Sequence, residues 1–306
     1  MITILIPCYN EKENIFEITK KFISICIKKK IKLDKIVLVD DGSKDKTWET
    51  IKTLHIKYKK KILGIKLSKN FGQQNAILAG LKECKSNYLL ITDADMQDPP
   101  ELIDKMLKLM IKEKANCVYG KRLSREDNIF KKIFSYLFYM LISTLTKNNI
   151  KKDVGDFKII DKKIVEELKK YKEIDPFLRG IISLIGFKQI PYKYHRKNRK
   201  IGNSGWSFAK LISFSLDGIF GFSNFPLKIG TLMTISSLLL FFYLAAESLL
   251  EYEKNIYVPG WKSLFLAIVF VSFVNFFMLT LLSEYIGRIY METKSRPRYI
   301  IEEKLS

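Results

Sequence analysis

Three oxygen-bearing side chains occupy alternate positions in the segment DADMQDPP, which covers residues 93–100. In an extended chain, residues i, i+2 and i+4 point to the same side, so Asp93, Asp95 and Gln97 can present oxygens to one centre. Such oxygen ligands suit Mg²⁺ or Mn²⁺ and not zinc, and a Mg²⁺ ion usually completes its shell with substrate phosphates. The segment therefore predicts a divalent-metal site that receives a nucleotide diphosphate, although a lone DxD spacing is also common in solvated loops.

A pair of acidic residues ends a second apolar run. Asp40 and Asp41 close KIVLVD, and the turn that follows contains Gly42 and Ser43, of which Ser43 is a candidate helix N-cap. An acid at the end of a strand can also accept hydrogen bonds from a ribose or from the N–H of a base. A capped turn and a nucleoside contact are both consistent with this pattern.

The elements that must position these residues are short β-rich runs that alternate with helical patterns over the first 120 residues. The runs are ITILIP, KIVLVD, ILGIKL and YLLITD, and helices are predicted over residues 11–29, 46–58, 72–84 and 100–114. This rhythm indicates βαβ crossovers and a mainly parallel, Rossmann-like α/β sheet. Such sheets bind ligands at the carboxyl ends of their strands, where the acidic clusters fall.

Composition and charge narrow the class of protein. The chain has 306 residues, 47% of them hydrophobic, with 53 basic and 32 acidic residues and a net charge of +21. That hydrophobic content predicts a folded core. Four widely spaced cysteines offer no CxxC pair, so neither a zinc site nor a disulfide framework is expected. The start of the chain has no basic segment before its apolar run, and we expect a cytoplasmic amino terminus.

Two uncharged runs near the carboxyl end predict a membrane anchor. Residues 229–246 and 263–282 carry no charge, and each approaches the ~20 residues needed to cross a bilayer core. Both are apolar on every face, which favours a transmembrane hairpin over buried helices of a soluble protein. Basic residues flank the hairpin outside its loop, so both of its ends are expected in the cytoplasm.

The whole excess charge lies before the hairpin and would draw that part of the chain to an anionic inner leaflet. Nucleic-acid binding is the rival explanation, but the anchor argues against it, and no nucleic acid is expected as a partner. Residues 129–145 and 207–222 place apolar side chains along one helical face. Each segment fits an interfacial helix, with packing against the sheet as the alternative.

Arginine is scarce before the hairpin, where lysine dominates the basic residues. An arginine in such a composition favours a position that requires a planar, bidentate donor, as for phosphate. Arg122, just after a strand, and Arg179, within FLRG, are interpreted in this way. For Arg199, in the basic loop YHRKNRK, chance placement stays open.

Seven motifs stand in order along the chain: VDDGSKDKT, LSKNFGQQNAILAGL, DADMQDPPE, GKR, GDFK, FLRGIISLIGF and SLDGIFGFSNFPLKI. Together they resemble glycosyltransferase family 2, and specifically its polyprenyl-phosphate glycosyltransferases. The resemblance implies a GT-A catalytic domain, a divalent metal, a nucleotide-sugar donor and a polyprenyl phosphate acceptor. It predicts a GT-A domain over residues 1–206, a juxtamembrane segment over 207–228, a transmembrane hairpin over 229–283 and a cytoplasmic tail over 284–306.

The resemblance also implies roles for individual residues. Asp156 in GDF matches the candidate catalytic acid, which would orient or deprotonate the acceptor or steady positive charge on the sugar. The matching nucleoside pocket consists of Pro7, Tyr9, Glu11 and Asp40, with Asp41 beside it. The basic positions expected to contact phosphate or acceptor are Arg122, Arg125, Lys131, Arg179 and Arg199. One departure is Ser204-Gly205-Trp206, where many relatives have Ser-Lys-aromatic, so any contact made by that lysine would fall to Lys200 or Lys210.

The activity expected is inverting transfer of a hexose from a nucleotide sugar, foremost UDP-glucose, to undecaprenyl phosphate at the bacterial inner membrane. Asp95, through the metal, and Arg179 would stabilise the departing diphosphate. A GDP-mannose-dependent enzyme stays open as an alternative. A polysaccharide synthase is disfavoured because no QxxRW-like element is present, and a silent scaffold or RNA-binding protein has no use for the motif set. A homo-oligomer is also expected.

Overall fold

The computed structural model describes residues 1–123, 154–171, 173, 176–195 and 260–306, together with most of 229–246. The chain divides into two compact units. The first comprises residues Met1–Tyr139, Asn148–Gly205 and Arg296–Ser306, and the second comprises Met140–Lys147 and Trp206–Ser295. Each unit is described by itself. The predicted sites at Arg125, Lys131 and Arg199, and the two predicted interfacial segments, lie outside the described residues.

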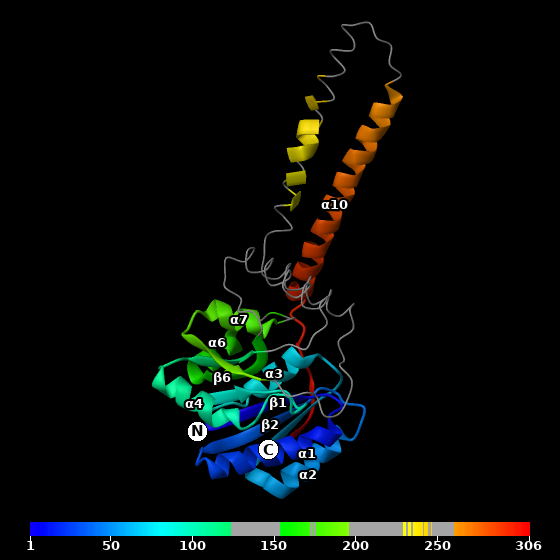
Figure 1. Ribbon diagram of the computed structural model, residues 1–306. Coiled ribbons are helices and arrows are strands. Elements are labelled where there is room, and N and C mark those ends of the chain that lie inside the picture. Colours follow the sequence, from blue (N-terminus) through cyan, green and yellow to red (C-terminus); the bar gives the residue numbers. More distant parts are fainter. Residues whose placement is uncertain are drawn as a thin grey trace. The chain divides into compact units, whose positions relative to one another are not determined.

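The first unit is built on an eight-stranded mixed sheet with strand order β7-β5-β6-β4-β1-β2-β3-β8 (Figure 1). Its parallel centre consists of β1 (Ile2–Cys8), β2 (Leu33–Asp40), β3 (Ile62–Leu67) and β4 (Tyr88–Ile91). These strands confirm the four predicted β-rich runs. On one side of this centre, β6 (Val154–Asp161) is antiparallel to β4 and to β5 (Cys117–Arg122), and β7 (Gln189–Tyr194) pairs in parallel with β5.

Helices cover both faces of the sheet. One face carries α1 (Lys12–Lys28), α2 (Thr47–Tyr58) and α4 (Leu102–Lys112), whose apolar residues join the main core beneath the strands. The opposite face carries α3 (Gln73–Leu81), α6 (Lys162–Lys170) and α7 (Leu178–Ile185), as Figure 1 shows. A short 3₁₀ turn, η1 (Lys59–Lys61), leads into β3. The four predicted helices are therefore present as α1 to α4, each slightly shorter than expected.

Helix α3 packs unusually close to the sheet. A Cβ atom at Gly80 would lie 2.1 Å from Cδ1 of Leu5 and 2.9 Å from Cγ2 of Val39, so only glycine fits there. This close approach fixes the position of α3 over β1 and β2. The amino-terminal end of α3 follows β3 directly, and it therefore begins at the carboxyl edge of the sheet where the acidic loops lie.

The carboxyl end of the chain forms the edge strand β8 (Ile301–Leu305), which is antiparallel to β3. Trp48 Nε1 donates to Oε2 of Glu303 at 2.8 Å, and Lys66 Nζ lies 2.8 Å from Oε1 of Glu302. No strand was predicted within residues 284–306, and their expected cytoplasmic location stays a prediction. The strand forms because the edge of β3 would otherwise leave its N–H and C=O groups unpaired.

The second unit contains the long helix α10 (Trp261–Thr293). Its part from Ala267 to Thr293 is the one helix, among the described residues, that is long and apolar enough to cross a membrane. The predicted run 263–282 lies within α10, which continues eleven residues further to Thr293. Glu284 and Arg288 form an ion pair one turn apart at 2.8 Å in this extension. The described residues of 229–246 are helical, and the remaining residues of that run are outside the description.

Candidate active site

Hydrogen bonds join the loops that follow β1 and β2. The backbone N–H of Asn10 donates to Oγ of Ser43 at 2.9 Å, and Lys44 N–H returns a bond to Oδ1 of Asn10 at 2.9 Å. The N–H of Glu11 donates to Oγ1 of Thr47 at 2.9 Å. Of the predicted nucleoside residues, Glu11 thus lies within this junction. Pro7 is buried in β1, and Tyr9 is exposed beside the junction.

Asp41 anchors the loop between β3 and α3. Its carboxylate accepts hydrogen bonds from the N–H groups of Phe71 at 2.7 Å and Gly72 at 2.9 Å. Burial raises the pKa of Asp41 to about 6, against the opposing effect of these two donors. The neighbouring Gly42 has φ +66°, and a Cβ there would lie 2.3 Å from the backbone carbon of Lys69. Asp41 therefore holds the start of α3 in place.

Asp40 keeps one oxygen available within the same region. Its Oδ1 accepts a bond from the N–H of Ser43 at 3.0 Å, whereas its Oδ2 is buried and has no hydrogen-bond partner in the described part of the chain. Burial raises the pKa of Asp40, because a buried carboxylate loses hydration. A buried acceptor of this kind fits an N–H or O–H donor supplied by a ligand.

Residues 93–98, which we call the metal loop, form a turn with Met96 at φ +59°, and not the extended segment that the spacing argument assumed. Asp93, Asp95 and Gln97 are partly exposed, whereas Ala94, Met96 and Asp98 are buried. The backbone N–H of Gln97 donates to Oδ1 of Asp95 at 3.1 Å, which fixes the Asp95 carboxylate against the turn.

The electrostatics of the metal loop favour a cation. Burial, followed by the neighbouring carboxylates of Asp156, Asp98 and Asp95, raises the pKa of Asp93 to about 7. A divalent cation would offset this repulsion. No group of three His, Cys, Asp or Glu side chains among the described residues is arranged to hold an ion alone. The oxygen donors of Asp93, Asp95 and Gln97 are of the kind that Mg²⁺ and Mn²⁺ accept.

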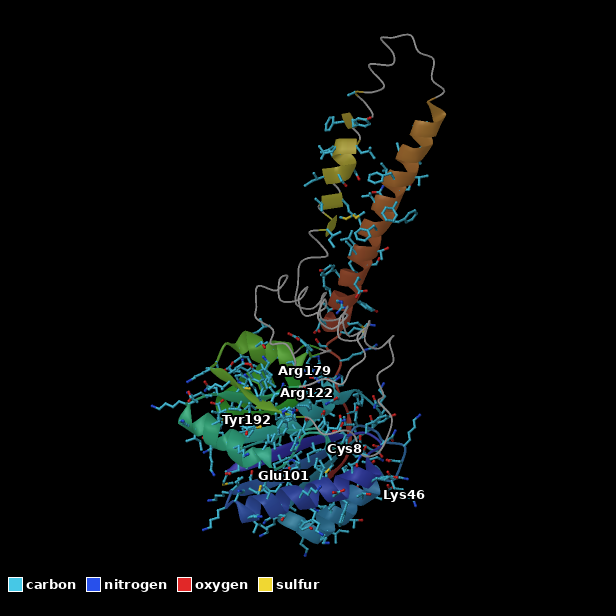
Figure 2. The ribbon with its side chains drawn as sticks, viewed as in Figure 1. Cys8, Lys46, Glu101, Arg122, Arg179 and Tyr192 are labelled. Atoms are coloured by element: carbon cyan, nitrogen blue, oxygen red, sulfur yellow. The ribbon has the colours of Figure 1, made fainter. Side chains whose placement is uncertain are left out.

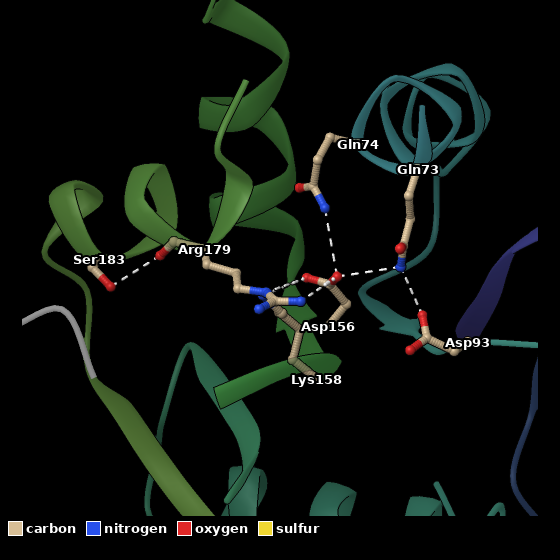
Figure 3. Close-up of polar contacts among 7 residues, drawn as sticks. All are labelled: Gln73, Gln74, Asp93, Asp156, Lys158, Arg179 and Ser183. Atoms are coloured by element: carbon tan, nitrogen blue, oxygen red, sulfur yellow. Dashed lines mark hydrogen bonds and ion pairs between the residues drawn. The ribbon is translucent and has the colours of Figure 1, made fainter. Parts of the chain in front are cut away.

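Asp156, on β6, is held by Arg179 of α7 (Figure 3). Nε of Arg179 donates to Oδ1 at 2.9 Å, and Nη2 donates to Oδ2 at 2.8 Å. Nζ of the buried Lys158 lies 3.9 Å from Oδ1. Burial alone would raise the pKa of Asp156, but Arg179, and after it Lys158, holds that pKa well below its usual range. Asp156 is thus an ionised carboxylate whose lone pairs are directed to protein donors.

Two glutamines complete the site and were missed in the sequence. Gln73 Nε2 donates to Oδ1 of Asp93 at 2.7 Å and to Oδ2 of Asp156 at 3.3 Å, so one amide bridges the metal loop and β6 (Figure 3). Gln74 Nε2 lies 3.5 Å from the same Oδ2. Their position in NFGQQNA, shortly after β3, could have identified them, because the first residues of a helix at this edge of the sheet point towards the ligand site.

Arg122 ends β5 and lies beside Asp98 and Tyr194. Burial tends to lower the pKa of Arg122, but the charge of Asp98 raises it, and overall the pKa is raised. Its Nε is buried without a hydrogen-bond partner among the residues described. Figure 2 labels Arg122 and Arg179, the two predicted phosphate-contacting arginines that the structure describes. Both interact electrostatically with Asp93.

The fold and this site define a glycosyltransferase with a GT-A-like α/β domain. Residues 3–169 match the profile of glycosyl transferase family 2, and the chain belongs to that family. An uncharacterized glycosyltransferase of Synechocystis is 35% identical over 99% of this chain and 95% of its own length. The bactoprenol glucosyl transferase of Shigella phage SfX is 32% identical over 99% of both chains.

Solved structures resemble the chain more distantly. Glucosyl-3-phosphoglycerate synthase from Mycobacterium tuberculosis, solved with Mn²⁺, UDP and glucosyl-3-phosphoglycerate, shares 15% identity with a TM-score of 0.47. The likeness covers 72% of this chain and 77% of that one. The mannosyltransferase PcManGT from Pyrobaculum calidifontis, in complex with GDP-Man and Mn²⁺, shares 16% identity over 63% and 54% of the chains, with a TM-score of 0.42.

Proposed function

We propose that this glycosyltransferase moves a hexose from a nucleotide sugar, foremost UDP-glucose, to undecaprenyl phosphate. The full-length similarity to proteins named bactoprenol glucosyl transferase supports the acceptor class. The observation that carries the chemistry is the assembly of Arg179, Asp156, Gln73 and Asp93 at the carboxyl edge of the sheet. In this assembly, an arginine held in one direction lies near the carboxylates that we propose bind the metal and, through the metal, the diphosphate.

Asp93 and Asp95 would hold the divalent ion, with Gln97 as a third oxygen donor. When bound, the ion supplies positive charge that stabilises the departing diphosphate. Asp40 would accept a hydrogen bond from the base or ribose through its buried Oδ2. Because uracil and guanine both offer ring N–H donors, this contact is compatible with UDP-glucose and with GDP-mannose as the alternative donor.

The reaction proposed is an in-line displacement with inversion. A phosphate oxygen of the acceptor forms a bond to the anomeric carbon, and the bond from that carbon to the nucleoside diphosphate breaks. A phosphate monoester is largely ionised at neutral pH, so this step requires no strong base. Arg179, partly exposed and oriented by two bonds to Asp156, would bind phosphate oxygens of the substrates.

Asp156 then has an orienting role. Its pKa lies well below the usual range because Arg179 and Lys158 offset the effect of its burial, and a carboxylate of that kind is a weak proton acceptor. Gln73 and Gln74 direct their amide donors to the same carboxylate. We therefore interpret Asp156 as the group that fixes Arg179, and the deprotonating role becomes the less favoured alternative.

Strand β8 supports the proposed membrane topology. The chain contributes strands to the same sheet before α10, through β1 to β7, and after it, through β8. If α10 crosses a bilayer, the chain must cross a second time between β7 and α10 for β8 to pair with β3. The uncharged run 229–246 is the segment suited to that crossing. Residues 229–283 would then form a hairpin with both ends in the cytoplasm of a bacterial inner membrane.

A donor panel tests this proposal. Purified full-length protein in detergent is mixed with undecaprenyl phosphate, Mg²⁺ or Mn²⁺ and one nucleotide sugar at a time, and the lipid product is identified by mass spectrometry. We expect hexosyl transfer from UDP-glucose. Transfer from GDP-mannose alone would favour the alternative donor, and growth of a free polysaccharide would favour a polysaccharide synthase. Oligomeric state and the absence of nucleic acid partners stay predictions.

A further inference from the structure

A buried polar cluster supports the metal loop from behind. Asp98, the last residue of that loop, is 2% exposed, and Tyr194 on β7 is 5% exposed. The Tyr194 hydroxyl donates to Oδ1 of Asp98 at 2.5 Å. The Arg122 guanidinium lies beside Tyr194 and Asp98, and its charge interacts favourably with Asp98. Burying these groups costs desolvation free energy, which the Tyr194–Asp98 hydrogen bond and this charge interaction offset.

Two glycines make room for the cluster. A Cβ at Gly120 would lie 2.7 Å from Cε1 of Tyr194, and a Cβ at Gly155 would lie 2.7 Å from Nη2 of Arg122. The rings of Phe157 and Tyr194 also meet edge to face, with centroids 5.7 Å apart. Strands β5 and β6 therefore fix the positions of Tyr194 and Arg122, which makes them a firm support for Asp98.

The metal loop contains a backbone conformation that needs such support. Met96 has φ +59°, in the left-handed region that residues other than glycine adopt at a cost. It lies between Asp95 and Gln97, two of the proposed metal-binding residues. Because Asp98 is tied to Tyr194 two residues after Met96, the loop is held at its end in this strained form.

We propose that Asp98 and Tyr194 are positioning residues that keep Asp95 and Gln97 where a divalent ion requires them. Arg122 supplies the charge that balances Asp98. Neither Asp98 nor Tyr194 touches the reacting atoms in this scheme, since both side chains are buried. The inference rests on the proposed function, because it assumes that the metal loop binds a cation together with a nucleotide.

Tyr194→Phe in the full-length protein tests the inference, since it removes the hydroxyl and keeps the ring that packs on Phe157. Mn²⁺ binding is measured by electron paramagnetic resonance with UDP or GDP, whichever the wild type binds. We expect the apparent Kd for Mn²⁺ to rise about tenfold, as for other groups that orient metal ligands. The rate at saturating Mn²⁺ should stay close to wild type, whereas the thermal unfolding midpoint should fall because Oδ1 of the buried Asp98 loses its donor. Asp98→Asn, which also keeps shape, should weaken Mn²⁺ binding too.

Tyr192→Phe is the matched control, because Tyr192 is on the same strand, two residues before Tyr194, and is partly buried (Figure 2). It should bind Mn²⁺ like wild type. If wild type binds Mn²⁺ and nucleotide but Tyr194→Phe binds Mn²⁺ just as tightly, the inference is wrong and the proposed function stands. A loss of thermal stability with unchanged Mn²⁺ affinity would also overturn it. A wild type that binds no Mn²⁺ with either nucleotide would overturn both.

Discussion

Arg179 and Asp156 form a two-point ion pair across α7 and β6, with donor–acceptor distances of 2.9 and 2.8 Å. The side chain of Asp156 is 1% exposed, whereas that of Arg179 is 28% exposed. The carboxylate is therefore enclosed by protein, and the arginine is the more exposed member of the pair. This asymmetry supports the proposal that Arg179 contacts substrate and that Asp156 orients it.

Arg179→Lys should slow transfer strongly while the protein still folds. Lysine keeps the charge but cannot make the planar two-point contact with Asp156 that fixes the direction of the arginine. We expect kcat/KM for undecaprenyl phosphate to fall by about 10- to 100-fold, corresponding to ~1.4–2.7 kcal/mol of transition-state stabilisation. Arg296→Lys, at an exposed position, is the control. Wild-type kinetics in Arg179→Lys would return Arg179 to a purely structural role.

Asp156→Asn should lower the free energy of unfolding at neutral pH. Breaking a buried ion pair costs about 3–5 kcal/mol, and we expect the lower end because Arg179 is partly exposed. The folded-state pKa of Asp156 is depressed, so the stabilisation is fully present above the unfolded pKa of about 3.9 and is lost as the pH falls through the folded pKa. The difference between wild type and variant should therefore narrow below about pH 4. Urea unfolding followed by far-ultraviolet circular dichroism measures this difference, and a gap independent of pH would contradict the ion-pair account.

Asp95→Asn should abolish transfer and leave the fold intact. The substitution removes one hard anionic ligand from the proposed metal site but preserves the size of the side chain. Transfer by the wild type should likewise stop in EDTA and return on addition of Mg²⁺ or Mn²⁺. Asp104→Asn, which alters an acid paired with Lys108 on α4 and outside the metal loop, is the matched control. Full activity of Asp95→Asn, or turnover undiminished by EDTA, would remove the metal assignment.

Asn255→Cys should report the topology of the hairpin. All four native cysteines are buried, and burial raises the pKa of Cys26 to about 11 and that of Cys84 to about 12. Their thiols should therefore stay unlabelled in the native protein. We expect a membrane-impermeant maleimide to label the new cysteine from the periplasmic side. Labelling only from the cytoplasmic side would contradict the hairpin.

The parallel centre of the sheet was predictable because each strand is a short apolar run followed by a polar cluster and a helical pattern. The place of Asp93, Asp95 and Gln97 after the fourth strand followed from the same pattern, whereas the turn at Met96 did not. Both predictions depend on local spacing, which a single sequence displays directly.

Other features depend on tertiary contacts that local spacing does not display. Gln73 bridges Asp93 and Asp156 only because Gly80 lets α3 lie close to β1. Strand β8 was missed because its five residues, which follow a long apolar helix, have the composition of a polar tail. Their partner, β3, lies more than 230 residues earlier in the sequence. The sequence likewise left the roles of Asp40 and Asp41 open, and the structure shows that Asp41 binds the loop before α3.

The acceptor phosphate is the centre of the account, and a comparison of two lipids tests it most directly. Full-length protein receives the preferred nucleotide sugar and divalent metal with either undecaprenyl phosphate or undecaprenol, and glycosylated lipid is measured by mass spectrometry. We predict transfer to undecaprenyl phosphate and none to undecaprenol, because the phosphate oxygen is the nucleophile and Arg179 its binding partner. Equal transfer to both lipids, or release of sugar to water with neither lipid modified, would contradict the account.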